Sequence, residues 1–256
     1  MLLTSVILIL QEILEAALLI SILAVLSRRQ GYGFDWLYYG LAAGGLFAWL
    51  YASNMRYVSE WWDYAGQEVV NAALQISIAA AIVALSWLIC RARPGTRHSR
   101  LFFLLAALTI GLAVTREGSE IGVYLGGFLS QPEKLQPVLT GGAIGAGIGL
   151  SIGFLVYYGL MALPGNAGTW TPLVLLALFC GNMLSQSAVQ LTQVDLLAAG
   201  PTLWDSSAWL PEHSMPGRLL YALIGYESTP SAMEVSAYLA GVLAVATSVA
   251  LGRRQR

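Results

Sequence analysis

The chain opens on the stretch that decides its fold: residues 1–26 read MLLTSVILILQEILEAALLISILAVL. This stretch is long enough to cross a bilayer, because a spanning helix needs about 20 mostly apolar residues. It has no basic segment ahead of the apolar run and no small-residue cleavage site, and it carries Glu12 and Glu15 in its middle. Residues 3–26 are therefore predicted to form a retained transmembrane helix rather than a cleaved signal peptide.

The composition of the whole chain points to the same environment. Of its 256 residues, 57% are hydrophobic and 11% are charged, whereas a soluble domain usually carries about 25% charged residues. So few charges cannot cover a water-facing surface, which predicts an all-α polytopic membrane protein. No strongly basic segment suggests binding to nucleic acid.

Seven apolar stretches are long enough to span the membrane. They cover residues 3–26, 37–55, 69–90, 101–129, 138–162, 171–197 and 233–252. Residues 1–256 are therefore predicted to form a single transmembrane domain with seven helices. In the long loop over residues 198–232, Leu219–Ile224 is predicted to form a short helix at the membrane interface.

The arginines between these stretches predict the orientation. They cluster in the first loop, the third loop and the C-terminal tail, at Arg28, Arg29, Arg91, Arg93, Arg97, Arg100, Arg253, Arg254 and Arg256. Seven spans would place all three segments on one side, and cytoplasmic loops are rich in lysine and arginine. The N-terminus is therefore predicted to lie outside and the C-terminus inside.

Two short motifs indicate an internal repeat. The first stretch holds Gln11-Glu12-Ile13-Leu14-Glu15, and the fourth holds Arg116-Glu117-Gly118-Ser119-Glu120, so both contain Glu-x-x-Glu. Three spans separate the motifs, which inverts the second copy relative to the first. The prediction is a 3+3 inverted repeat of residues 1–92 and 100–198, with the helix over residues 233–252 outside it. Transporters of this plan bind their substrate at the repeat interface.

The motif carboxylates are predicted to face the protein interior. A charged side chain at the centre of a spanning helix costs roughly 2.5–3.5 kcal/mol, and a spacing of three places both glutamates of a motif on one helix face. Glu12, Glu15, Glu117 and Glu120 would then converge with Arg116, and a cation or protons would balance their charge. The alternative is a set of buried ion pairs that only fixes the packing of the helices.

The ligand types favour a hard cation. Carboxylate oxygens suit iron, manganese, magnesium or calcium, and protons remain an alternative. His98 and His213 fall in predicted loops, and Cys90 and Cys180 lie in apolar runs, which disfavours copper(I) and zinc.

Further polar side chains share helix faces with the predicted site. Glu68, Asn71 and Gln75 follow one face of the third stretch, and Asn182, Gln186 and Gln190 follow one face of the sixth. Amides in such rows either line a path or bond neighbouring helices, and the two interpretations stay open. Glu68 is the stronger candidate because it is ionisable and near the predicted outer mouth. Glycines 141, 145, 149 and 153 predict a close-packing face.

The sequence of Arg116–Glu120 resembles the Arg-Glu-x-x-Glu signature of the oxidase-dependent iron permeases, which include the yeast high-affinity iron permease and bacterial iron-uptake permeases. Gly66-Gln67-Glu68, Leu203–Ser207 and Gly225–Ser231 are also similar to parts of that family. The first motif departs from the family pattern, since Gln11 stands where arginine is usual.

This resemblance implies inward iron transport. The implied metal-binding residues are Glu12, Glu15, Glu117, Glu120 and Glu68, and the implied supporting residues are Arg116, Gln11, Asn71 and Gln75. It implies no permanently bound cofactor and an external partner that supplies iron, either a ferroxidase or periplasmic iron-handling proteins. The compact loops favour a bacterial inner membrane.

Other functions fit the sequence less well. A retinal photoreceptor needs a lysine within a helix, but the chain's one lysine, Lys134, falls in a predicted loop. No nucleophile–base set accompanies the carboxylates, so an enzyme is not expected. The nearest alternative is a proton-coupled transporter of another divalent cation.

Overall fold

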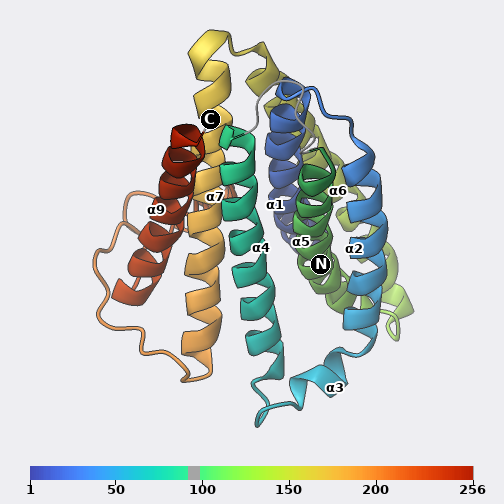
Figure 1. Cartoon of the computed structure of the whole chain (residues 1–256). Coiled ribbons are helices and arrows are strands. Elements are labelled where there is room, and N and C mark those ends of the chain that lie inside the picture. Colours follow the sequence, from blue (N-terminus) through green and yellow to red (C-terminus); the bar gives the residue numbers. More distant parts are fainter. Residues whose placement is uncertain (92–98, 256) are drawn as a thin grey trace.

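The computed structural model describes residues 1–91 and 99–255 as a bundle of helices (Figure 1). Arg93, Arg97, His98 and Arg256 lie outside these residues. The helices are α1 (Leu2–Arg29), α2 (Asp35–Ser53), α3 (Met55–Ser59), α4 (Gly66–Arg91), α5 (Ser99–Gly126), α6 (Pro132–Ala162), α7 (Gly165–Gln193), α8 (Met215–Ile224) and α9 (Ala232–Arg254). The predicted all-α class is confirmed.

Six of the described helices are long and apolar enough to cross a membrane: α1, α4, α5, α6, α7 and α9. The predicted second span, residues 37–55, corresponds to α2, whose 19 residues are rich in tryptophan, tyrosine and glycine. It is not among the six, so the count of seven spans stays a prediction.

Two helices begin about two turns earlier than predicted. α6 starts at Pro132 rather than at residue 138, and α7 starts at Gly165 rather than at residue 171. Pro137 is the sixth residue of α6 and Pro172 is the eighth residue of α7. Each helix therefore continues through a proline and loses one intrahelical hydrogen bond there.

Small residues let two helix pairs approach closely: α1 with α6, and α2 with α5. A Cβ added at Gly145 on α6 would meet the Val6 carbonyl oxygen of α1. A Cβ added at Gly44 on α2 would lie 2.8 Å from the Gly111 carbonyl oxygen of α5. The glycines at 141, 145, 149 and 153 all face α1, which confirms the predicted packing face.

The described arginines of the two loops and the tail lie at one end of the bundle, where α1 and α4 finish and α5 starts (Figure 1). Arg29 donates to the carbonyl oxygens of Leu160 (3.1 Å) and Leu163 (2.9 Å) at the end of α6. The Arg253 guanidinium lies 3.9 Å from the centre of the Trp170 ring. We call this the arginine end. That it faces the cytoplasm stays a prediction.

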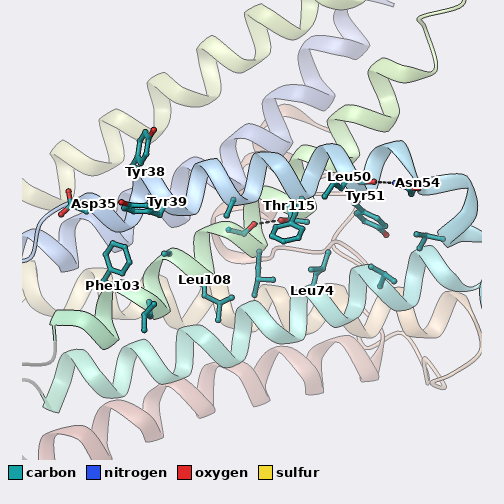
Figure 2. A pocket seen from close by; sticks show the side chains of 18 residues that line it. Asp35, Tyr38, Tyr39, Leu50, Tyr51, Asn54, Leu74, Phe103, Leu108 and Thr115 are labelled. Atoms are coloured by element: carbon teal, nitrogen blue, oxygen red, sulfur yellow. Dashed lines mark hydrogen bonds between the residues drawn. The ribbon is translucent and has the colours of Figure 1, made fainter.

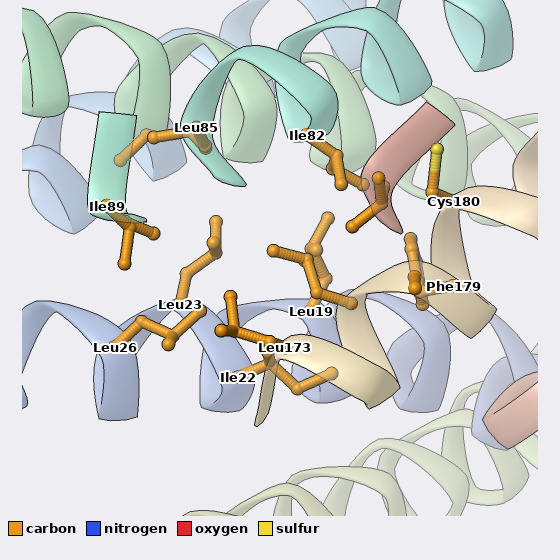
Figure 3. Packing of buried hydrophobic residues seen from close by; sticks show 14 of the residues in the cluster. Leu19, Ile22, Leu23, Leu26, Ile82, Leu85, Ile89, Leu173, Phe179 and Cys180 are labelled. Carbon is orange, nitrogen blue, oxygen red and sulfur yellow. The ribbon is translucent and has the colours of Figure 1, made fainter. Parts of the chain in front are cut away.

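A dense apolar core fills the half of the bundle next to the arginine end (Figure 3). Leu19 and Leu23 of α1 meet Ile82 and Leu85 of α4 and Leu173 of α7, and all five are buried. The motif glutamates belong to the other halves of α1 and α5, so this core separates them from the arginine end.

The short helix predicted at Leu219–Ile224 forms as α8 and begins four residues earlier. The Ser214 hydroxyl caps it by accepting from the Gly217 N–H at 3.1 Å, and Gly225 ends it with φ of 70°. Ala222 packs against Leu14 and Leu18 of α1. This contact places α8 against the helix that carries the first motif.

Candidate metal centre

Carboxylates from α1 and α5 meet inside the bundle. Glu12, Glu117 and Glu120 each offer one carboxylate oxygen, and the three oxygens lie within 4.8 Å of one another. Glu12 and Glu117 are buried, and Glu120 is partly buried. The glutamates of each motif share a helix face because their spacing of three is close to one turn, and packing of α1 on α5 brings the two faces together. A cluster of this kind can coordinate a hard cation through oxygen.

Arg116 binds the same carboxylates. Its Nη1 lies 2.6 Å from Glu117 Oε1 and 3.2 Å from Glu15 Oε2, and its Nε lies 3.6 Å from Glu120 Oε1. One guanidinium cannot neutralise four ionised carboxylates. Because an uncompensated buried charge is costly, the excess negative charge needs a cation or protons.

One carboxylate oxygen is placed to accept such a cation. Glu117 is 3% exposed; its Oε1 pairs with Arg116, but its Oε2 is buried with no hydrogen-bond partner among the described residues. Buried polar atoms are nearly always paired in native proteins, so this carboxylate oxygen beside Glu12 can accept a cation or a proton.

Glu15 stands apart from the group of three. It is 2% exposed and bonds to Arg116 Nη1, so its carboxylate fixes the arginine rather than completing the oxygen cluster. Gln11, one residue before the first glutamate, is partly buried and makes no hydrogen bond to the described residues. Its neutral side chain therefore leaves Arg116 as the cation of the centre.

Glu68 lies outside the group, in the first turn of α4. Its Oε2 is buried without a described partner. Tyr51 on α2 lies within electrostatic range of both Glu68 and Glu120, and its hydroxyl donates to Asn71 Oδ1 at 3.1 Å. Polar groups thus extend from the motif glutamates toward the end of the bundle opposite the arginines.

Gln75 meets a residue that the sequence did not single out as a site residue. Gln75 Nε2 donates to Gln186 Oε1 of α7 at 2.9 Å, and both side chains are buried. A signal existed: Asn71-x-x-x-Gln75 and Asn182-x-x-x-Gln186 share one spacing on the third and sixth predicted spans.

A large cavity of about 1290 Å³ lies between α2, α4 and α5 (Figure 2). Leu74 and Leu108 are among its mostly apolar lining, while Tyr51 and Asn54 stand near one end and Asp35 near the other. None of the motif glutamates lines it. The cavity therefore offers no set of ligands for an ion.

Comparison with known proteins finds similarity to iron permeases. The profile of a family described as the iron permease FTR1 family matches residues 96–253. Ferrous iron permease EfeU of Shigella sonnei is 27% identical over 275 aligned positions, which cover 96% of this chain and 94% of that protein. Ferrous iron permease EfeU of Escherichia coli O6:H1 is 28% identical over 260 positions, covering 90% and 88%. No solved structure matches the chain.

Proposed function

The chain belongs to the iron permease FTR1 family, and from this premise we propose that its two Glu-x-x-Glu motifs form the site through which iron moves inward. The observation that carries the proposal is the cluster of three carboxylate oxygens, from Glu12, Glu117 and Glu120, within 4.8 Å of one another. The membership makes the chain an iron permease of the membrane, and we place it in a bacterial inner membrane.

The composition of the cluster suits iron as a transported ion. Its ligands are oxygens, so a hydrated ferrous ion can exchange water for carboxylate. Arg116 shares Glu117 and Glu120 with the ion, and this competition weakens binding. A transport site must release its cargo, and either return of Arg116 to Glu117 or protonation of one carboxylate would favour release.

The features on each side of the cluster support the proposed inward direction of transport. Glu68 and Tyr51 lead toward the end opposite the arginines, whereas the apolar core closes the path toward the arginine end (Figure 3). If the arginine end faces the cytoplasm, as the positive-inside rule predicts, this conformation receives iron from outside. We place the iron-supplying partner, a ferroxidase or a periplasmic iron-handling protein, at the end that carries Glu68.

Passage inward then requires the apolar core to separate. The packing of the helices supports an inverted repeat of the two halves, residues 1–92 and 100–198, a plan on which transporters alternate access to a central site. A shift of 105 positions superposes Glu12 on Glu117, and it also superposes Gly40 and Gly44 on Gly145 and Gly149. The packing is reciprocal too, since α1 lies on α6 while α5 lies on α2.

The test is iron uptake into proteoliposomes that contain the purified protein. Glu117→Gln and Glu12→Gln each remove a charge from the cluster and should lower uptake at least tenfold, which corresponds to about 1.4 kcal/mol. Glu133→Gln is the matched control, because Glu133 is exposed at the start of α6.

Manganese and zinc as competitors test the identity of the ion. Wild-type uptake of iron should withstand an equal concentration of either. Absence of iron uptake by the wild type, with its supplying proteins present, would refute the iron assignment. Preferred uptake of manganese would favour a proton-coupled transporter of another divalent cation.

A further inference from the structure

The third helix of each proposed half carries the same pair of amides. α4 holds Asn71 and Gln75, and α7 holds Asn182 and Gln186, both pairs four residues apart. Gln75 is 0% exposed and Gln186 is 3% exposed, and they bond to each other at 2.9 Å. Equivalent positions of the two halves therefore meet in the interior of the bundle.

The mutual bond leaves one polar atom of each glutamine unused. Gln75 Oε1 and Gln186 Nε2 are buried with no hydrogen-bond partner among the described residues. Leaving a buried donor or acceptor unpaired is costly. The pair therefore still has one acceptor and one donor to offer to neighbouring polar groups.

The unused nitrogen of Gln186 lies beside the first motif. The Gln186 amide is close enough to the Glu15 carboxylate to interact with it, although no hydrogen bond of standard geometry joins them. Glu15 accepts from Arg116 at 3.2 Å and so offers acceptor oxygens at this contact. The amide must therefore turn its nitrogen toward Glu15, and its oxygen then accepts from Gln75 as observed.

The contact between Gln186 and Glu15 matters because Arg116 is shared between two glutamates. Arg116 Nη1 is divided between Glu117 Oε1 at 2.6 Å and Glu15 Oε2 at 3.2 Å. A cation that binds Glu117 repels Arg116 and draws Glu117 away from it. Glu15 would then lose or share its donor, and it is too buried for water to replace that donor freely.

We propose that Gln186 is a positioning residue of the ion site, which holds Glu15 in place through Nε2 while Arg116 shifts, and that Gln75 fixes the orientation of Gln186. This role rests on the proposed function, because it has meaning only if the motifs bind a transported cation. It also explains why α7, which carries neither motif, contributes a buried amide beside Glu15.

The test exchanges donor and acceptor. Gln186→Glu keeps the shape of the side chain and still accepts from Gln75, but it sets a carboxylate against Glu15. Iron uptake into proteoliposomes should fall about tenfold, mainly as a raised KM. Gln186→Met keeps the length of the side chain but has no N–H donor, and it should show a similar loss. Gln193→Glu, exposed at the end of the same helix, should transport like the wild type.

The outcomes separate the two proposals. If Gln186→Glu transports like Gln193→Glu while Glu117→Gln is inactive, the role of Gln186 is refuted and the motif site stands. If Gln186→Met transports like the wild type, no donor is needed at this position and the role of Gln186 is refuted. If Glu117→Gln transports normally, the motif site itself is refuted.

Discussion

Replacing Arg116 by glutamine should both destabilise the protein and make its stability depend on a cation. Arg116 is 7% exposed and pairs with Glu117 at 2.6 Å and with Glu15 at 3.2 Å. Removing one partner of a buried ion pair costs about 3–5 kcal/mol, because it leaves buried charge without compensation. In a chain of this size each 1 kcal/mol shifts the melting temperature by about 2–4 °C, so Arg116→Gln should melt roughly 6–20 °C below the wild type.

Thermal unfolding of the detergent-solubilised protein measures this effect, with and without ferrous iron under anaerobic conditions. A ligand present at 100 times its dissociation constant stabilises by about 2.7 kcal/mol, and in Arg116→Gln the cation no longer competes with the guanidinium. Iron should therefore raise the melting temperature of the variant more than that of the wild type.

The matched control for this prediction is Arg56→Gln. Arg56 also pairs with a glutamate one turn away, Glu60 at 3.9 Å, but its side chain is 97% exposed. Surface pairs of this kind contribute little, so no resolvable change is expected. If Arg116→Gln and Arg56→Gln have the same melting temperature, the buried pairs of Arg116 do not stabilise the fold. If iron stabilises Arg116→Gln no more than the wild type, Arg116 does not compete with the cation.

Three further predictions concern packing, pH and a hydrogen bond. Gly145→Leu should cost about 1–3 kcal/mol by overpacking α6 against α1. Gly147 has open space around it, so Gly147→Leu should leave thermal stability unchanged. If the two variants had the same melting temperature, the close packing of α6 on α1 would be contradicted. Burial, and then the hydrogen bond and charge of Glu234, raise the pKa of Glu227 to about 8 from its ordinary 4.5. Between these pH values the folded state holds a proton that the unfolded chain has lost, so the contribution of Glu227 to stability should decrease between about pH 4.5 and pH 8. Glu227→Gln should flatten that decrease. An unchanged slope of stability against pH would exclude Glu227 as its source. Tyr51→Phe removes the bond to Asn71 and should cost about 1 kcal/mol in thermal unfolding; no loss would mean that water replaces it.

Much of the fold could be predicted from the sequence because the membrane imposes simple rules. A long apolar run such as residues 3–26 has few alternatives to a helix, and α1 covers Leu2–Arg29. The glycines spaced by four on α6 predicted a close approach to a neighbouring helix, but not that the neighbour is α1. Hydropathy does not identify α2 as a spanning helix, because its tryptophans, tyrosines and glycines lower the mean hydropathy. Gly40 and Gly44 of α2 still pack against α5.

The sequence predicted the residues of the candidate site better than it predicted how they are arranged. Cost and spacing indicated that the four glutamates and Arg116 face inward, and the structure places them on neighbouring faces of α1 and α5. Spacing could not tell that Arg116 engages Glu15, since that pairing depends on how two helices cross. Gln186 was interpreted only as one of a row of amides, because its partner Gln75 lies 111 positions away.

Iron X-ray absorption spectroscopy of the purified protein loaded with ferrous iron shows which atoms bind the ion. We expect an iron site whose nearest shell is entirely oxygen, present in the wild type and in Glu133→Gln but lost in Glu117→Gln. An unchanged spectrum and unchanged iron content in Glu117→Gln, or a shell that contains sulfur or imidazole nitrogen, would contradict the claim that the two motifs bind the ion.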